Sequence, residues 1–125
     1  MAYFLGIDAG GSHCRSRLID ADGTILGTGE TGPANARIGA ERLQATLMDA
    51  ANQAIETAGL DGDQVATIAA GMGIAGLSHP GAREALTAIA WPFAAMHFET
   101  DAVIANIGAH MGQDGATLVI GTGSI

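Results

Sequence analysis

The sequence contains no lysine: all five basic residues among its 125 are arginines, namely Arg15, Arg17, Arg37, Arg42 and Arg83. Without lysine, neither the phosphate loop that ends in Gly-Lys followed by Ser or Thr nor the lysine-dependent protein-kinase pattern can occur in it. The arginines form no run, and the formal net charge at pH 7 is -8. A nucleic acid or an anionic membrane surface is therefore not an expected partner.

Cysteine and long apolar runs are also scarce. Cys14 is the only cysteine, which excludes an intrachain disulfide or a cluster of thiolate metal ligands, and the four histidines show no metal-ligand spacing. The N-terminus lacks the basic and apolar regions of a signal peptide, and no apolar run approaches the roughly 18 residues of a membrane span. We therefore expect a cytoplasmic protein whose core draws on the 48% of residues that are hydrophobic.

The first third of the sequence predicts an antiparallel meander of three strands. Residues 3–8 have the pattern of a buried strand, residues 14–20 alternate, and Asp22-Gly23 turns the chain into a third strand over residues 24–30. Gly10, Gly11 and Ser12 form the predicted turn between the first two strands. The segment TGPANARIG that follows is expected to be a loop, because Gly-Pro does not belong in a regular element.

The rest of the sequence predicts helices that alternate with strands. Apolar residues at helical spacing indicate a long helix over residues 40–58, with Gly59 as its stop. The later elements are expected as a strand within 64–76, a helix over 79–90, a strand over 93–100, a helix over 101–111 and a strand over 115–125. Strands linked by helices imply an α/β fold with a parallel portion of the sheet and helices on both faces.

Two strands end in clusters of glycine and hydroxyl residues, GIDAGGS and VIGTGS. Exposed backbone N–H groups in such loops can surround an anion, and glycine permits the close approach and the positive φ that such a nest requires. Asp8 could hold Mg²⁺ through water, because this ion keeps much of its hydration shell. A tight hairpin with a solubilising serine would explain either loop alone, whereas the two together favour phosphate binding.

The segment GMGIAG, residues 71–76, matches the dinucleotide-binding pattern G-x-G-x-x-G and follows a predicted strand. In a dinucleotide site the helix begins within the glycines. Here residues 78–81, Ser-His-Pro-Gly, insert a turn before the next predicted helix, and the motif comes after an antiparallel meander with which such folds do not start. We therefore do not expect a dinucleotide site.

Two polar residues have both a structural and a functional explanation. Asp101 follows a predicted strand and begins a predicted helix, so it could be an N-cap or a general base at the carboxyl end of a parallel strand, where α/β sheets bind ligands. Asn35 could be a plain turn residue or could present its amide to a substrate hydroxyl. The residues alone leave both questions open.

The stretch FLGIDAGGSHCRSRLIDADG resembles the first phosphate loop of the superfamily of sugar kinases, heat-shock chaperones and actin. With GPAN, GIAG, TDA, GAHMGQDGA and GTGS in this order, the chain resembles the N-acetylglucosamine and glucosamine kinase branch, which shares a family with the ATPase subunits of benzoyl-CoA reductase. The resemblance implies a ribonuclease H-like mixed sheet in an N-terminal actin-like ATPase domain, residues 1–114. Residues 115–125 would then be the first strand and second phosphate loop of a truncated C-terminal domain.

The resemblance also implies an activity, namely transfer of the γ-phosphate of ATP to the 6-hydroxyl of N-acetylglucosamine or glucosamine, with Asp101 as the base and Mg²⁺ held by Asp8. The residues that would contact phosphates are Gly10, Gly11, Ser12, Gly121, Thr122, Gly123 and Ser124. The residues that would contact the sugar are Asn35, Ala75, Gly76 and Thr100.

The chain departs from the family at two points. Ser12 and His13 stand where Thr and then Lys or Arg are common, which removes a fixed positive charge near the phosphates. Family members also carry a second domain that supplies the adenosine site, so the 125-residue chain alone is predicted to be inactive.

Three alternatives remain open. The parent protein could be an activator ATPase of the benzoyl-CoA reductase or 2-hydroxyacyl-CoA dehydratase type, although Cys14 alone cannot hold an iron-sulphur cluster. It could be a sugar sensor that has lost catalysis, or an actin-like assembly module. The expected partner is a small amino sugar, with a homodimer possible through the edge of the last strand.

Overall fold

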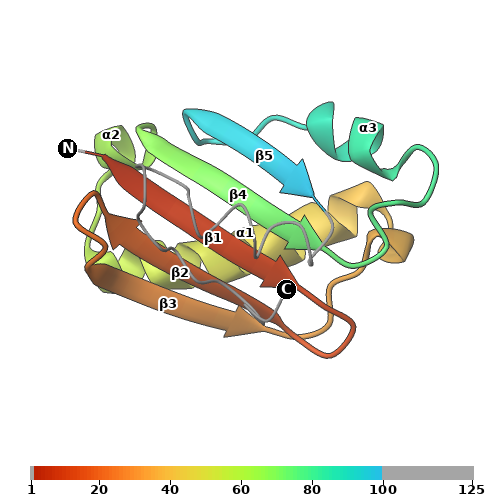
Figure 1. Cartoon of the computed structure of the whole chain (residues 1–125), viewed down its shortest axis with the longest axis horizontal. Coiled ribbons are helices and arrows are strands. Elements are labelled where there is room, and N and C mark those ends of the chain that lie inside the picture. Colours follow the sequence, from red (N-terminus) through yellow and green to blue (C-terminus); the bar gives the residue numbers. More distant parts are fainter. Residues whose placement is uncertain (1, 100–125) are drawn as a thin grey trace.

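The computed structural model describes residues 2–99, which form one five-stranded sheet with helices packed against it (Figure 1). The strands are β1 (Tyr3–Ala9), β2 (Cys14–Asp20), β3 (Ile25–Thr31), β4 (Ile68–Ile74) and β5 (Ala95–Glu99). The helices are α1 (Ala40–Ala58), α2 (Gly62–Val65) and α3 (Ala82–Thr87), together with a short 3-10 helix, η1 (Ala36–Ile38). None of the helices in this part of the chain is long and apolar enough to cross a membrane.

The sheet has the strand order β3-β2-β1-β4-β5 and mixes two kinds of pairing. The first three strands pair in antiparallel fashion, which confirms the predicted meander, and β4 and β5 extend β1 in parallel. The carboxyl ends of β1, β4 and β5 therefore lie at one edge of the sheet, with Ala9 beside Ile74 and Gly73 beside Glu99. That edge is where ligands bind in α/β sheets.

Helix α1 packs unusually close to strands β2 and β3. A Cβ atom on Gly27 would lie 2.1 Å from the Ala54 carbonyl oxygen, and one on Gly29 would lie 2.3 Å from the Ala50 carbonyl oxygen. The buried Ser16 hydroxyl donates to the same Ala50 oxygen at 2.6 Å. Glycines on the strand and alanines on the helix thus allow backbone-to-backbone packing that larger side chains would prevent.

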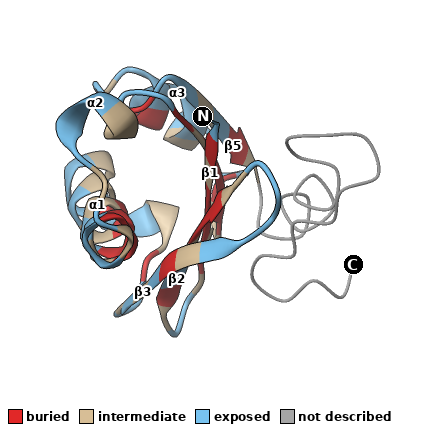
Figure 2. Cartoon of the chain, turned by 90° about the vertical axis from the view of Figure 1, so that its left-hand side faces the viewer, coloured by how far each residue is buried: buried red, intermediate tan, exposed pale blue. Residues whose placement is uncertain are grey.

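All of the helices in the described range lie on the same side of the sheet as α1 (Figure 2). The buried side chains on this side include Leu5, Ile7, Leu18, Leu43, Leu47 and Met72. The helix over residues 101–111 that would cover the other side, and the strand over 115–125, lie outside the described residues.

Several predicted boundaries were wrong for local reasons. Gln64 and Val65, predicted as the start of a strand, belong to α2, because Asp61 and Gln64 make a reciprocal capping box with bonds of 2.8 and 2.9 Å. Helix α3 starts at Ala82, since Gly81 has a φ of 83°. β5 starts at Ala95, and residues 36–38 of the predicted loop form η1.

Candidate functional site

The turn between β1 and β2 is tight and carries the predicted phosphate-binding residues. The Gly10 N–H donates to the His13 carbonyl oxygen at 2.9 Å, while Gly11 and Ser12 are exposed. A Cβ on Gly11 would meet nothing within 4 Å. Neither Gly10 nor Gly11 has a positive φ, so the expectation that this loop needs one was wrong. The glycines instead leave the outer surface of the turn open to close approach by a ligand.

Asp8 lies on the face of the sheet opposite α1. Its neighbours Ile7 and Ala9 are fully buried in the core, and successive side chains in a strand point to opposite faces. Gly73 is its partner on β4, so no side chain stands beside it there. Residues 2–99 contain no cluster of three potential metal ligands. Arg15 on β2 is the other cross-strand partner of Asp8. A Mg²⁺ ion held by Asp8 would need water and phosphate oxygens as its other ligands.

Three loop segments meet at the carboxyl ends of β1 and β4. The Ala34 N–H donates to the Gly10 carbonyl oxygen at 3.0 Å, the Ala36 N–H donates to the Ala75 oxygen at 2.9 Å, and the Ala75 N–H donates to the Ala9 oxygen at 2.8 Å. Asn35 forms a parallel bridge with Ala75. The structure thus brings the predicted sugar contacts Asn35, Ala75 and Gly76 together, next to the predicted phosphate loop.

The carboxamide of Asn35 is oriented by its own loop. Its Oδ1 accepts from the Arg37 N–H at 2.9 Å and caps η1. The Nδ2 group, which can only donate, is then the end of the amide that a ligand can use. This cap is the structural role that the sequence left open for Asn35, and it is compatible with ligand binding.

The position of the Asn35 side chain requires a glycine at residue 76. Gly76 has a φ of 82°, and a Cβ at this position would lie 2.6 Å from Oδ1 of Asn35. A larger residue would strain the backbone and displace the amide. Glycine at this position therefore keeps the Asn35 side chain where it is.

Cys14 follows the phosphate-binding turn but does not contribute a thiolate. Burial raises the pKa of the Cys14 thiol to about 11, with the charges of Asp8 and Asp49 adding to the rise and a hydrogen bond with Thr31 opposing it. The thiol is therefore neutral at physiological pH, and this residue acts as a small apolar group in the core.

The remaining predicted site residues are Thr100, Asp101, Gly121, Thr122, Gly123 and Ser124, and they lie outside the described residues. β5, which precedes Thr100, ends at Glu99 beside Gly73. The last described residue of β5 therefore reaches the same edge of the sheet as Asp8 and Ala75.

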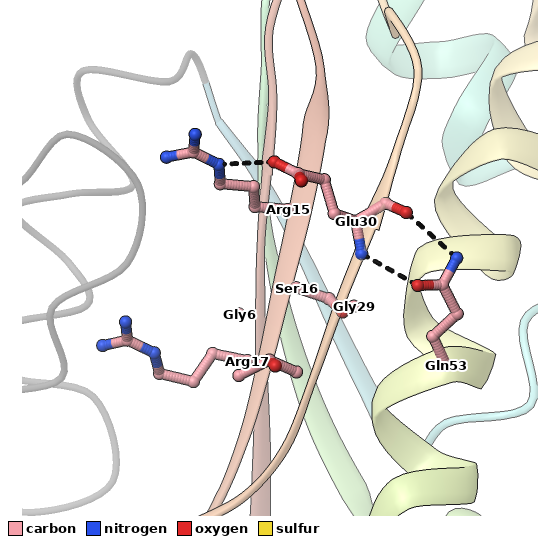
Figure 3. A pocket seen from close by; sticks show the side chains of 8 residues that line it. Gly6, Arg15, Ser16, Arg17, Gly29, Glu30 and Gln53 are labelled. Atoms are coloured by element: carbon pink, nitrogen blue, oxygen red, sulfur yellow. Dashed lines mark hydrogen bonds and ion pairs between the residues drawn. The ribbon is translucent and has the colours of Figure 1, made fainter.

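A cavity of about 440 Å³ lies against β2 and β3 (Figure 3). Figure 3 shows Arg15 and Arg17 projecting from the same side of β2, away from α1. Arg15 Nε pairs with a Glu30 carboxylate oxygen at 2.9 Å, and the Gln53 amide bonds to both the N–H and the carbonyl oxygen of Glu30 at 3.0 Å. The sequence did not predict this cluster, because it joins residues from three separate elements. The side-chain amide of Gln53 covers backbone groups of the edge strand β3.

A mixed sheet in which three antiparallel strands are continued by two parallel ones, in the order seen here, is the ribonuclease H-like sheet of an actin-like ATPase domain. The chain belongs to the BadF/BadG/BcrA/BcrD ATPase family, whose sequence pattern matches residues 5–125. This confirms the resemblance found in the sequence.

Known proteins related to this chain include sugar kinases. The glucosamine kinase GspK of Vibrio cholerae is 39% identical over 124 residues, which make up 99% of this chain and 42% of GspK. The crystal structure of a proposed N-acetylglucosamine kinase from Chromobacterium violaceum matches with a TM-score of 0.75 and 30% identity, over 89% of this chain and 39% of that one. The chain spans less than half the length of these relatives.

A more distant structure shares only the fold. The ROK hexokinase of Thermus thermophilus matches with a TM-score of 0.57 and 23% identity, over 86% of this chain and 38% of the hexokinase.

Proposed function

We propose that this chain is the N-terminal part of an ATP-dependent kinase that phosphorylates the 6-hydroxyl of glucosamine or N-acetylglucosamine. The observation that carries the proposal is the hydrogen-bonded meeting of the Gly10, Asn35 and Ala75 segments at the carboxyl edge of the sheet. Membership of an ATPase family and the likeness to GspK support the use of ATP and an amino sugar.

The phosphates of ATP would bind at the turn after β1. The backbone N–H groups of Gly10, Gly11 and Ser12 would donate to β and γ phosphate oxygens, and Asp8 would hold Mg²⁺ through water. When bound, Mg²⁺ would offset the charge that develops on the transferring phosphoryl group. The second phosphate loop would come from Gly121, Thr122, Gly123 and Ser124.

The sugar would bind beside this turn. Asn35 would donate from Nδ2 to a sugar hydroxyl oxygen, since its Oδ1 already accepts from the Arg37 N–H. The backbone of Ala75 and Gly76 would contact neighbouring hydroxyls, and Thr100 would complete the set. Such polar contacts fix the acceptor hydroxyl in line with the γ-phosphate, and this positioning is a major source of rate.

Asp101 would accept the proton of the sugar's 6-hydroxyl. As it does so, the hydroxyl oxygen forms a bond to the γ-phosphorus, and the bond between that phosphorus and the ADP oxygen breaks. A positioned base of this kind typically contributes about 10² to 10⁴ in rate. The 125-residue chain by itself would show no sugar-dependent turnover, because it covers only 42% of the length of GspK.

The proposal is tested by measuring ADP release from Mg-ATP by the complete protein that carries this chain. The assay is run without sugar and then with glucosamine, N-acetylglucosamine or glucose. Release that depends on an amino sugar is the expected result. Release that is independent of sugar would favour an activator ATPase, and sugar binding without release would favour a sensor.

A further inference from the structure

Arg83 of α3 contacts the last two residues of β5. One guanidinium nitrogen donates to the Phe98 carbonyl oxygen, and the other pairs with Oε2 of Glu99 at 3.2 Å. The second carboxylate oxygen of Glu99, Oε1, lies 3.2 Å from Nε2 of His97. Both oxygens of Glu99 are therefore engaged, and the end of the strand is held from its backbone and from its side chain.

The helix that carries Arg83 is itself anchored in the core. Leu86 is 1% exposed, and the Trp91 ring nitrogen donates to the Leu86 carbonyl oxygen at 3.1 Å. The Trp91 ring lies 5.6 Å from the ring of Phe98, centre to centre. The base of the Arg83 side chain is thus fixed relative to β5, and α3 begins six residues after Gly76.

We propose that Arg83 is a positioning residue, which fixes the carboxyl end of β5 relative to the Ala75–Gly76 turn. The catalytic part of this inference rests on the proposed function. Thr100 and Asp101, the proposed sugar contact and the proposed base, follow directly after Glu99 in the sequence. Arg83 contacts neither ATP nor sugar in this account. Its planar guanidinium can serve a carbonyl and a carboxylate at once, which a lysine ammonium on its flexible stem does less well.

A plain surface ion pair is the competing explanation. The Arg83 and Glu99 side chains are 46% and 24% exposed, and exposed pairs of this kind add little to stability. A role in stability alone would therefore leave both local order at the end of β5 and turnover almost unchanged when Arg83 is replaced.

The first test is amide hydrogen exchange on the 125-residue chain. In Arg83→Ala we expect exchange at Phe98 and Glu99 to rise about tenfold or more, as local opening there becomes easier. Exchange in β1 should be unchanged. The exchange rate at the end of β5 in Arg83→Lys should lie between the rates in the wild-type chain and in Arg83→Ala. Arg42→Ala, an exposed arginine of α1, is the matched control. Unchanged exchange at Phe98 and Glu99, or a rise across the whole sheet, would overturn the inference.

The second test is steady-state kinetics of the complete protein. Arg83→Ala should lower kcat for the amino sugar by about 10- to 100-fold, the range expected for a misplaced catalytic group, with little change in KM. Arg83→Lys should recover part of the loss. Wild-type protein without sugar-dependent turnover would refute the proposed function, and hydrogen exchange would still decide whether Arg83 holds β5. Normal kcat in an Arg83→Ala variant of an active enzyme would overturn the catalytic part.

Discussion

The amide oxygen of Asn35 lies 2.6 Å from the point where a Cβ atom would stand on Gly76. The same oxygen accepts the Arg37 N–H and caps η1. The oxygen of this side chain thus caps its own loop and lies against the turn after β4, and only half of the amide is used. The other half, the Nδ2 donor, is the group that we assign to sugar recognition.

Asn35→Asp separates these two functions. A carboxylate can still accept the Arg37 N–H, so the free energy of unfolding should change by less than about 1 kcal/mol, the usual worth of such a cap. The Nδ2 donor is lost, and sugar affinity in the complete protein should fall by about 10-fold or more, as expected for a lost donor opposite a polar group. Calorimetric titration with the sugar measures the effect.

Asn52→Asp is the control for that variant, because Asn52 lies exposed on α1, away from the site. It adds the same charge and should bind sugar normally. Equal sugar affinity in Asn35→Asp and wild-type protein would contradict the assigned role of Nδ2.

Gly76→Ala should damage both stability and binding. The new methyl group meets Asn35 Oδ1, and the φ of 82° is strained for any residue with a Cβ. We expect a loss of about 1–3 kcal/mol in unfolding free energy together with weaker sugar binding. Urea unfolding of the chain provides the measurement.

Gly62→Ala is the matched control, since a Cβ at Gly62 would meet nothing within 4 Å and its φ is not positive. It should be neutral or slightly stabilising. If Gly76→Ala were as stable as this control, the close contact with Asn35 would not constrain the loop.

The Cys14 thiol should make stability depend on alkaline pH. Its pKa is raised from 9.0 to about 11 by burial, so the folded state holds this proton more tightly than the unfolded state. The resulting stabilisation is fully present below pH 9 and is lost as the pH rises towards 11. Two pKa units correspond to about 2–3 kcal/mol.

Urea unfolding at several pH values between 8 and 11 would measure this loss. Cys14→Ala removes the titrating group and should flatten the slope in that interval, even if it lowers stability overall. A wild-type slope identical to that of Cys14→Ala would show that the thiol does not ionise on unfolding.

Asp101→Asn tests the proposed base in the complete protein. The amide cannot take the proton of the sugar hydroxyl, so turnover should fall by about 10² to 10⁴. Sugar affinity should stay close to that of the wild type, because the amide keeps the size of the side chain. Near-normal turnover would remove Asp101 from this role.

Local patterns in the sequence were enough to predict most of the sheet. Buried and alternating runs located β1, β2 and β4, and Asp22-Gly23 located a turn where Gly23 indeed has a φ of 85°. Helix α1 was predicted with its observed bounds, because its apolar spacing is regular and Gly59 ends it. α2 was missed, although the capping pair Asp61 and Gln64 is visible in the sequence, because this single turn of helix runs almost directly into the apolar residues of β4.

The candidate site was only partly predictable. Gly10, Gly11 and Ser12 follow a strand, so their place at its end could be inferred from the chain itself. The meeting of Asn35 with Ala75 could not, since it depends on hydrogen bonds between loops 40 residues apart, and it was expected only from the family resemblance. Nothing in the sequence indicated that Arg83 contacts the end of β5. Its partners Phe98 and Glu99 are 15 and 16 residues away, and only the folded sheet brings them to α3.

We propose an amino sugar as the phosphoryl acceptor. The most direct measurement is phosphorus NMR of the products after the complete protein has acted on Mg-ATP and glucosamine. We predict a new phosphomonoester signal coupled to the two protons on carbon 6, formed in step with ADP. Formation of ADP and inorganic phosphate alone, with the sugar unchanged, would contradict the account.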